Sequence, residues 1–310
     1  MDGIKVRDVA DVSFSAPDLA LMRVFLEDFG LEAAPDSSDE VLYMRGAGAA
    51  PFLYRTRAGQ PEFLGTTLEA SCLSDLERLS RCTGAAIADA RTPGGGYELE
   101  LTDPDNMAVS VVAERSPMPA ATPMARAGWN DTETRRRVRA VKRVPPSPSQ
   151  VVRLGHVVLS VTDFRASERW WKDRFGFITS DEVQLPNGFA FGAFMRCDRV
   201  KEPTDHHSLF LVQMPGGKPG FHHAAFEVRD LDDLMAGHNH LQRRQHRPAW
   251  GVGRHTLGSQ VFDYWLDPWT HQLEHWTDGD LFIAEDAPRI ATVGELMGTQ
   301  LGLAAPSAHP

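Results

Sequence analysis

Two long segments of this 310-residue chain resemble each other, which indicates an internal duplication. VADVSFSAPDLALMRVFLEDFGLE (residues 9–32) matches LGHVVLSVTDFRASERWWKDRFGF (residues 154–177). Both patterns predict a short strand of alternating residues, a turn at Asp18 or Asp163, and an amphipathic helix that ends at a glycine. A duplication on this scale restricts the fold to similar modules that are stacked on one another and share a core.

Two further pairs of segments extend the match along both halves of the chain. LEASCLSDLERL (residues 68–79) matches FEVRDLDDLMAGHNHL (residues 226–241), and each reads as a strand end that runs into a helix. LTDPDNMAVSVV (residues 101–112) matches LDPWTHQLEHW (residues 266–276), where Asp-Pro predicts a hairpin between two strands. We therefore predict an α+β fold of two tandem domains, each made of paired βαβββ modules that curl into an open barrel around a cavity.

The segment between the two copies has a different composition. It contains Pro- and Ala-rich stretches and the basic run RRRVRAVKR (residues 135–143), which favour a solvated linker or a linker helix over a nucleic-acid patch. We predict an N-terminal domain over residues 1–114, a linker over 115–150, a second domain over 151–280 and a tail over 281–310.

Composition and charge exclude several classes of function. The formal net charge of −10 argues against a nucleic-acid partner, because binding phosphates requires a basic face. No run of eighteen apolar residues predicts a membrane span, and the first residues lack the pattern of a signal peptide. The three cysteines are an odd number without paired metal-ligand spacing. We expect a reduced, cytoplasmic protein.

The two copies differ in three side chains that could bind a metal. The aligned pairs are His156 with Asp11, His223 with Gly65, and Glu274 with Ser110. A side chain that stabilises the fold should occur in both copies, whereas these three occur together in one copy and are absent together from the other. We therefore predict a site grafted onto the second copy, with a metal-free N-terminal copy kept for structure.

Two histidines and one carboxylate on one face of an octahedron are typical of iron(II) oxygenases, because three adjacent positions stay open. Each candidate lies in a predicted strand, where alternation can direct it to the interior. The same alternation predicts that His222 and His223 point to opposite faces, and that Glu274 and His275 do so too. A structural histidine with satisfied hydrogen bonds is the alternative interpretation, and the spacing alone leaves both open.

These residues resemble the type I extradiol ring-cleaving dioxygenases of the vicinal oxygen chelate superfamily. GRHTLGSQVFDYWLDPWTHQLE (residues 253–274) is similar to the family signature, in which Gly-x-His is followed by Tyr-x-x-Asp-Pro and the ligand Glu. LGHVV and FHHAAFEV resemble the segments that carry the two ligand histidines. Two positions depart from the pattern. Asp263 stands where an apolar or aromatic residue is usual, and Leu257 stands where several members carry a polar residue that helps to bind substrate.

The resemblance implies an enzyme of aromatic catabolism that opens the ring of a catechol with O2. It implies that His156, His223 and Glu274 hold Fe(II), with Mn(II) as the alternative ion because the same ligand set accepts both. The partners would be the catechol and O2, without nucleic acid or membrane. Each domain leaves part of its sheet edges uncovered, so we expect a homo-oligomer.

The resemblance also implies roles for side chains around the metal. His207 would be the general acid–base, with His206 as the alternative, because an imidazole exchanges protons near neutral pH. Tyr264 and His255 would donate hydrogen bonds to substrate oxygens, and core packing is the alternative role of Tyr264. Three aromatic residues are candidates for the walls of the ring site, with core packing again as the alternative: Trp250, Phe189 and Phe191.

Two other functions fit the same fold. One is a glyoxalase-like isomerase or epimerase of the superfamily, which would use an extra Glu or Gln ligand that the N-terminal copy does not offer. The other is a metal-free protein that sequesters an aromatic compound. Metal analysis separates the second from an enzyme, and oxygen consumption separates the first from a dioxygenase.

Overall fold

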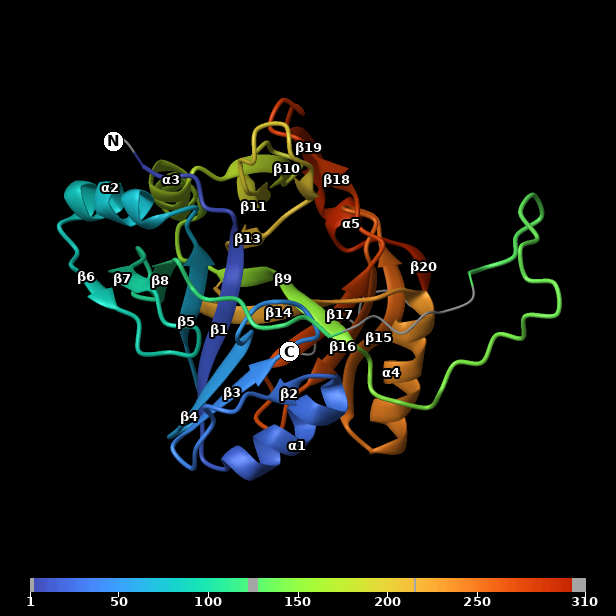
Figure 1. Cartoon of the computed structure of the whole chain (residues 1–310). Coiled ribbons are helices and arrows are strands. Elements are labelled where there is room, and N and C mark those ends of the chain that lie inside the picture. Colours follow the sequence, from blue (N-terminus) through green and yellow to red (C-terminus); the bar gives the residue numbers. More distant parts are fainter. Residues whose placement is uncertain (1–2, 122–127, 215, 303–310) are drawn as a thin grey trace.

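The computed structural model describes residues 3–121, 128–214 and 216–302 (Figure 1). Four βαβββ modules follow one another, two in each half of the chain. The predicted α+β class is confirmed, with few helices and two large sheets. No described strands close a sheet into a barrel, which agrees with the open arrangement that the sequence predicts.

The N-terminal half forms an eight-stranded sheet in the order β2-β3-β4-β1-β5-β8-β7-β6. The central strands β1 and β5 are antiparallel and begin the two modules, so the modules meet in the middle of the sheet. The elements of this half are β1 (Asp8–Ala16), α1 (Leu19–Phe29), β2 (Glu32–Ala33), β3 (Val41–Arg45), β4 (Tyr54–Ala58), β5 (Glu62–Glu69), α2 (Leu73–Thr83), β6 (Ile87–Asp89), β7 (Tyr97–Thr102) and β8 (Ala108–Ala113).

The C-terminal half repeats this order in a ten-stranded sheet, β19-β10-β11-β13-β9-β14-β17-β16-β15-β20. Its module elements are β9 (Val151–Ser160), α3 (Phe164–Phe175), β10 (Ile178–Gln184), β11 (Ala190–Arg196), β13 (Leu209–Val212), β14 (Gly220–Val228), α4 (Leu231–Arg243), β15 (Arg247–His255), β16 (Val261–Leu266) and β17 (Gln272–Thr277). The additional elements are β12 (Thr204–Asp205), β18 (Leu281–Phe282), β19 (Arg289–Thr292), α5 (Val293–Leu296) and β20 (Thr299–Gly302).

The first helix of each half begins and ends where the sequence predicts. Asp18 and Asp163 are the N-caps, and each carboxylate accepts a hydrogen bond from the backbone N–H three residues later, at 2.8 and 3.0 Å. Gly30 and Gly176 follow the last turn with φ of 107° and 70°, a left-handed conformation that glycine adopts without strain.

The apolar faces of the helices pack against the sheets and form one core that extends through both halves. In α3, Phe164, Trp171 and Phe175 are fully buried, as their helical spacing predicts. Truncating an aromatic side chain at such a position costs about 3–5 kcal/mol, because the cavity left behind does not close. The core therefore fixes the strands that carry the candidate site.

A cluster of charged groups joins the two halves where α1 lies next to α4. The Asp28 carboxylate accepts hydrogen bonds from His240 and His246, both at 2.8 Å, and from Arg244 at 2.9 Å. Burial alone would raise the pKa of Asp28, but hydrogen bonds from these three partners lower it below its usual value. The halves are therefore held together by ionic contacts as well as by the shared core.

The two segments outside the modules, residues 115–150 and residues 281–302, differ in secondary structure. The described residues of 115–150 form no helix or strand, and their middle part projects away from the body (Figure 1). By contrast, residues 281–302 join the second sheet, because β19 pairs with β10 and β20 pairs with β15. The buried Arg196 also donates to the carbonyl oxygens of Ile283 and Asp286, at 3.1 and 2.7 Å.

The described residues can also be checked for membrane-spanning helices and for disulfide bonds. No helix among the described residues is long and apolar enough to cross a membrane. Cys72, Cys82 and Cys197 form no disulfide bonds.

Candidate metal centre

Three adjacent strands of the ten-stranded sheet bring His156, His223 and Glu274 together. His156 on β9 and Glu274 on β17 pair with the same residue of β14, Ala225, and His223 precedes that residue by two. Since residues two apart in a strand share a face, the three side chains meet on one face of the sheet. They are 1%, 8% and 0% exposed, and one ligand atom from each lies within 4.8 Å of the others.

The distances between these atoms fit a shared metal ion. The Nε2 atoms of His156 and His223 lie 3.2 and 3.3 Å from Oε2 of Glu274. Two ligand atoms that are each about 2.1 Å from an ion and at right angles to one another are about 3 Å apart. The site therefore has the separation expected of neighbouring positions in one coordination shell.

The hydrogen bonding of the three side chains points the same way. Both carboxylate oxygens of Glu274 are buried without a hydrogen-bond partner, although two histidine Nε2 atoms lie close to Oε2. The Nδ1 of His156 is also buried without a partner. An unpartnered buried carboxylate is costly, and a cation removes that cost. Two imidazoles and one carboxylate suit Fe(II) or Mn(II) and leave coordination positions for other ligands.

The ionisation of the three side chains also suits a cation. Burial would raise the pKa of Glu274, but the contacts with His156, His223 and His255 lower it well below its usual value. Burial lowers the pKa of His223 to about 3. Near neutral pH the site therefore offers a carboxylate and a neutral imidazole without first releasing a proton.

The backbone around His223 departs from regular alternation. A β-bulge interrupts the pairing of β14 with β9 between Phe221 and His223. As a result His222 and His223 both line the same cavity, with their Nδ1 atoms 2.8 Å apart, and the expectation that they point to opposite faces is wrong. The contact between the two rings holds the His223 imidazole with Nε2 towards Glu274.

Glu274 and His275 do diverge, as the strand period predicts. His275 Nε2 donates to the carbonyl oxygen of Phe29 at 2.7 Å, and its ring stacks on the Phe29 ring. This histidine therefore contacts the N-terminal half, on the far side of the sheet from the candidate metal centre.

A cavity of about 330 Å³ opens beside the three side chains, within the range of about 300–1,000 Å³ that small-molecule sites occupy. One end is polar and the rest is mainly apolar. The polar lining residues are His156, His207, His222, His223, His255, Gln260, Tyr264 and Gln272. The apolar lining residues are Val158, Phe194, Phe210, Val212, Met214, Ala249, Trp250, Leu257, Leu296 and Met297.

His207 and His206 take different positions relative to this cavity. The His207 ring lies 4.0 Å from the His156 ring and lines the cavity, whereas His206 is not among the lining residues. His206 contacts His207 through the two Nδ1 atoms at 3.0 Å, and its Nε2 contacts Asp181 at 2.7 Å. Burial, followed by the neighbouring His156, lowers the pKa of His207 well below its usual value.

Tyr264 and His255 form a hydrogen-bonded pair next to the carboxylate. The Tyr264 hydroxyl lies 2.9 Å from His255 Nε2, and Tyr264 pairs with Glu274 across β16 and β17. Burial and the negative charge of Glu274 raise the pKa of Tyr264 well above its usual value, so the hydroxyl keeps its proton. The Trp250 ring stacks on the Tyr264 ring at 5.6 Å.

The two residues that depart from the family pattern, Asp263 and Leu257, lie in different places relative to the cavity. Asp263 is fully buried on the other face of β16, where it contacts His238 at 3.1 Å and accepts from Trp265 Nε1 at 2.6 Å. Leu257, in contrast, lines the cavity. Only the second departure therefore affects the surface that a ligand meets.

Of the three aromatic candidates for the walls, Trp250 lines the cavity, while Phe189 and Phe191 do not appear among its lining residues. Phe194 and Phe210 line it instead, with their rings stacked at 4.0 Å. Neither residue carried a signal in the sequence beyond being an aromatic in a strand. The lining residues from the C-terminal segment were also missed, because tertiary pairing alone brings β19 and α5 to this side of the sheet.

The equivalent positions of the N-terminal half hold a different arrangement. Asp11 on β1 and Ser110 on β8 both pair with Thr67 of β5. In the same way, His156 and Glu274 both pair with Ala225 of β14. The Asp11 carboxylate accepts from Thr67 at 2.9 Å and from Arg115 at 2.8 Å. The buried carboxylate of this half is therefore satisfied by protein groups.

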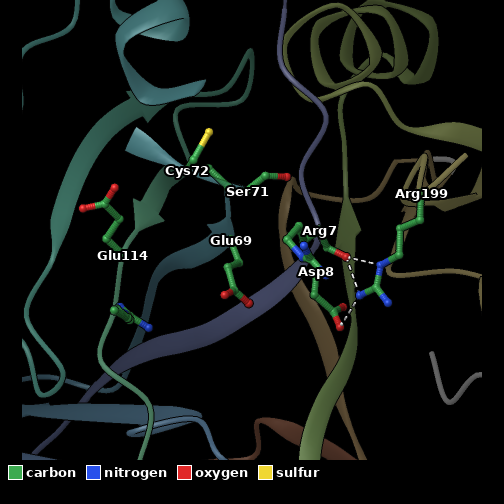
Figure 2. A pocket seen from close by; sticks show the side chains of 9 residues that line it. Arg7, Asp8, Glu69, Ser71, Cys72, Glu114 and Arg199 are labelled. Carbon is green, nitrogen blue, oxygen red and sulfur yellow. Dashed lines mark hydrogen bonds and ion pairs between the residues drawn. The ribbon is translucent and has the colours of Figure 1, made fainter. Parts of the chain in front are cut away.

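A second, larger cavity of about 510 Å³ lies where β1 faces the C-terminal half (Figure 2). Three arginines and three carboxylates are among its lining residues, so their charges balance. Arg199 donates to the carbonyl oxygen of Arg7 at 2.8 and 2.6 Å and to Asp8 at 3.2 Å, as Figure 2 shows. These contacts link the two halves.

Comparison with known families agrees with the position of the site. Residues 153–274 match the model of the Glyoxalase/Bleomycin resistance protein/Dioxygenase superfamily. The matched segment contains the three candidate metal ligands, most of β9, all of β14 and β16, and every polar residue that lines the cavity.

Among curated proteins, the chain is 26% identical to metapyrocatechase 2 of Cupriavidus necator over 287 residues, which are 91% of this chain and 84% of the relative. It is 29% identical over 139 residues to a manganese-dependent 2,3-dihydroxybiphenyl 1,2-dioxygenase of Geobacillus genomosp. 3, covering 43% of this chain and 42% of that protein. It is 30% identical over 135 residues to an iron-dependent extradiol dioxygenase of Rhodococcus jostii, covering 41% and 43%.

Solved structures share the overall fold. A Mn(II)-bound glyoxalase from Novosphingobium aromaticivorans superposes with a TM-score of 0.78 at 22% identity, covering 98% of this chain and 95% of that chain. A homoprotocatechuate 2,3-dioxygenase from Brevibacterium fuscum superposes with a TM-score of 0.76 at 18% identity, covering 94% and 77%. At these identities the likeness shows the fold alone.

Proposed function

We propose that this chain, whose residues 153–274 belong to the Glyoxalase/Bleomycin resistance protein/Dioxygenase superfamily, is an extradiol dioxygenase that opens the ring of a catechol with O2. The observation that carries the proposal is the buried, unpartnered carboxylate of Glu274 beside the Nε2 atoms of His156 and His223. The names of the relatives support the reaction class, since three of them are extradiol or catechol dioxygenases.

His156, His223 and Glu274 would hold Fe(II), with Mn(II) as the alternative. Relatives named iron-dependent and manganese-dependent both match this part of the chain. The ion would supply the redox chemistry and the Lewis acidity that lowers the pKa of a catechol hydroxyl. The protein's part is to orient the substrate, to exclude water and to move protons.

His207 would be the residue that transfers protons to and from the substrate. It lines the cavity next to His156, and its Nδ1 contacts His206, which leaves Nε2 as the nitrogen available to substrate. Burial keeps the imidazole neutral, so it would first accept a proton from the catechol and later return it to the opening ring. His206 and Asp181 would hold the ring in place.

Tyr264 and His255 would orient the substrate oxygens. Tyr264 keeps its proton and can donate it to an oxygen in the cavity, and His255 holds the hydroxyl from the other side at 2.9 Å. Trp250 stacks on Tyr264 and restricts its movement. These contacts would fix the diol relative to the metal before O2 enters.

The proposal also covers the location, the oligomeric state, the partners and the domain roles of the enzyme. We propose a cytoplasmic homo-oligomer without a nucleic-acid or membrane partner. The net charge of −10 supports the absence of a nucleic-acid partner. The N-terminal domain (residues 1–114) would be structural and the second domain (residues 151–280) catalytic, with residues 115–150 as the linker between them and residues 281–310 as the tail.

The test is oxygen consumption by the protein loaded with Fe(II) under nitrogen. A dioxygenase should consume one O2 per catechol once oxygen is admitted, with a yellow ring-opened product, and the Glu274→Gln variant should do neither. If the wild-type protein binds one ion per chain and isomerises a glutathione hemithioacetal without taking up O2, the glyoxalase-like alternative replaces this proposal. A protein that binds no metal would be the sequestering protein.

A further inference from the structure

We propose that the cavity selects catechols whose ring carries an uncharged apolar substituent and rejects those that carry a carboxylate. This inference rests on the proposed function, because it assumes that the diol binds at the metal end. It adds the class of substrate, which follows from the side chains that the ring substituent of a bound catechol would contact.

The charge of the lining is the first observation. Of the described residues that line the cavity, none is Lys, Arg, Asp or Glu. The lining histidines and Tyr264 are candidate ligands or lie next to one, so they would meet the two hydroxyl oxygens. A carboxylate elsewhere on the ring would therefore be desolvated without a cation to compensate for the lost water, since Gln260 and Gln272 offer only neutral amide groups.

The apolar wall is the second observation. Val158, Phe194, Phe210, Val212 and Leu257 all line the cavity and belong to one small buried cluster, which is separate from the main core. The Phe194 ring contacts the His207 ring edge-on at 4.8 Å, so this wall begins directly beside the polar end. A substituent on a bound catechol would meet apolar atoms next to the reacting ring.

The C-terminal segment completes this wall. Leu296 packs against the same buried cluster and lines the cavity together with Met297. The segment is held by the pairing of β19 with β10 and by the Thr292–Glu295 capping box of α5. A flexible Met and a Leu give this side of the cavity an apolar surface that can adapt to alkyl or aryl groups.

The arginines of the surrounding strands are held by other groups. Arg196 on β11 donates to backbone carbonyl oxygens, Arg254 on β15 pairs with Asp278 at 2.7 Å, and Arg289 on β19 pairs with Asp181 at 2.9 Å. None of the three is a lining residue. A carboxylate in the cavity would therefore have to draw a cation away from an existing partner.

Leu257 is the residue that we expect to determine this preference. It follows His255 in the chain, is buried, and stands where the sequence resemblance leads us to expect a polar side chain that binds substrate. Because it belongs to the apolar cluster and faces the cavity, a single substitution there can change the charge of the wall without touching the three metal ligands.

The test compares substrates that differ in charge but hardly in size. Isothermal titration under nitrogen would measure the binding of 3-isopropylcatechol and 2,3-dihydroxybenzoate, and of 4-isopropylcatechol and 3,4-dihydroxybenzoate, to the Fe(II)-loaded protein. In at least one pair the isopropyl compound should bind about 100-fold more tightly or better, and in neither pair should the carboxylate be favoured. Carboxylates that bind as tightly as their partners would overturn the inference and leave the dioxygenase proposal intact.

Absence of binding by every compound, unsubstituted catechol included, would contradict the proposed function and the inference together. Oxygen uptake separates this outcome from the previous one, because a dioxygenase that binds the carboxylates as tightly as their partners still consumes O2 with them.

A substitution sharpens the test. Leu257→Arg should weaken the binding of the preferred isopropyl compound by about 10-fold or more and strengthen that of its carboxylate partner, so that the preference reverses or nearly vanishes. Leu301→Arg introduces the same charge at an exposed leucine of β20 (66% exposed) and should leave the preference unchanged. Metal content reports whether each variant is folded, and equal effects of the two variants would overturn the role of Leu257.

Discussion

The two halves of this molecule place a carboxylate at the centre of the same sheet arrangement and satisfy it in opposite ways. In the N-terminal half, Asp11 is held by Thr67 and Arg115 at hydrogen-bond distance. In the C-terminal half, Glu274 is buried without a hydrogen-bond partner and faces two imidazole nitrogens. The strand register is the same in both halves, so the difference lies in the side chains and not in the backbone.

The comparison shows what separates a structural carboxylate from a candidate ligand. A carboxylate whose acceptor sites are filled by protein donors contributes to stability and has no capacity left for a cation. A buried carboxylate with empty acceptor sites and neutral imidazoles beside it is costly until a cation arrives. Burying the Glu274 carboxylate in this state destabilises the fold, and the large core formed by both halves compensates for that loss of stability.

The largest effect is expected from Glu274→Gln. The change keeps the shape of the side chain but removes its charge, so the variant should lose its metal and at least about 10³-fold of its activity, since a catalytic metal contributes several kcal/mol. Metal analysis and oxygen uptake measure these losses. The metal-free variant should be at least as stable as the metal-free wild type, because an unpaired buried charge has been removed.

The matched control is Ser110→Ala, at the equivalent position of the N-terminal half. It should leave metal content and activity unchanged. An equal loss in the two variants would mean that both halves contribute to one site, and the contrast between them would not hold.

His207→Phe should separate metal binding from turnover. The phenyl ring fills the space of the imidazole, so the protein should keep one ion per chain, while kcat falls by about 10²–10⁴-fold for want of a proton donor. His206→Gln should have a smaller effect, because His206 does not line the cavity. A larger loss in His206→Gln than in His207→Phe would assign the proton transfer to His206 instead.

Asp11→Ala tests the structural half of the comparison. Removing this carboxylate leaves the Arg115 guanidinium, whose side chain is only 10% exposed, without its ionic partner, so the free energy of unfolding should fall by about 3 kcal/mol. Chemical denaturation measures this, and metal content at low temperature should stay at one ion per chain. The double variant Asp11→Leu with Arg115→Met should recover most of the stability; a single variant as stable as wild type would show that the pair has no structural role.

The smallest effect is a pH dependence that belongs to the C-terminal half. In the metal-free protein His223 has a pKa of about 3, against 6.5 for an ordinary histidine. Between these values the unfolded chain binds a proton that the folded chain does not, so stability falls as the pH is lowered from 6.5. The slope from this residue is at most about 1.4 kcal/mol per pH unit.

His223→Asn removes that titration and should reduce the slope of stability against pH by about the same amount. Denaturation at a series of pH values between 4 and 7 measures both proteins. Identical slopes would show that His223 does not control the acid sensitivity.

Much of the fold could be predicted from the sequence because local signals and the duplication agree. Asp18 and Asp163 cap their helices, and Asp267 accepts from two backbone N–H groups in the hairpin that Asp-Pro predicts. The pairing of His156 with Asp11 across the two copies is confirmed by the strand register. Each of these signals is carried by residues that are close in the chain or repeated in it.

Other features of the site depend on tertiary structure that the sequence does not encode locally. The β-bulge before His223 interrupts the alternation of side chains between the two faces of the strand. His222 therefore faces the cavity, whereas the sequence predicts that it points to the opposite face from His223. Phe194 lines the cavity and Phe191 does not, although both lie on the same strand and in the same cluster. Met297 reaches the cavity only because a short parallel strand docks on β10, which no periodicity near Met297 predicts.

Anomalous diffraction of iron in crystals of the Fe(II)-loaded protein would locate the metal ion directly. We expect one strong peak per chain, about 2.0–2.2 Å from Nε2 of His156, Nε2 of His223 and an oxygen of Glu274. No peak is expected beside Asp11. A strong peak elsewhere, or an iron ion that none of the three side chains contacts, would show that His156, His223 and Glu274 do not form the metal centre.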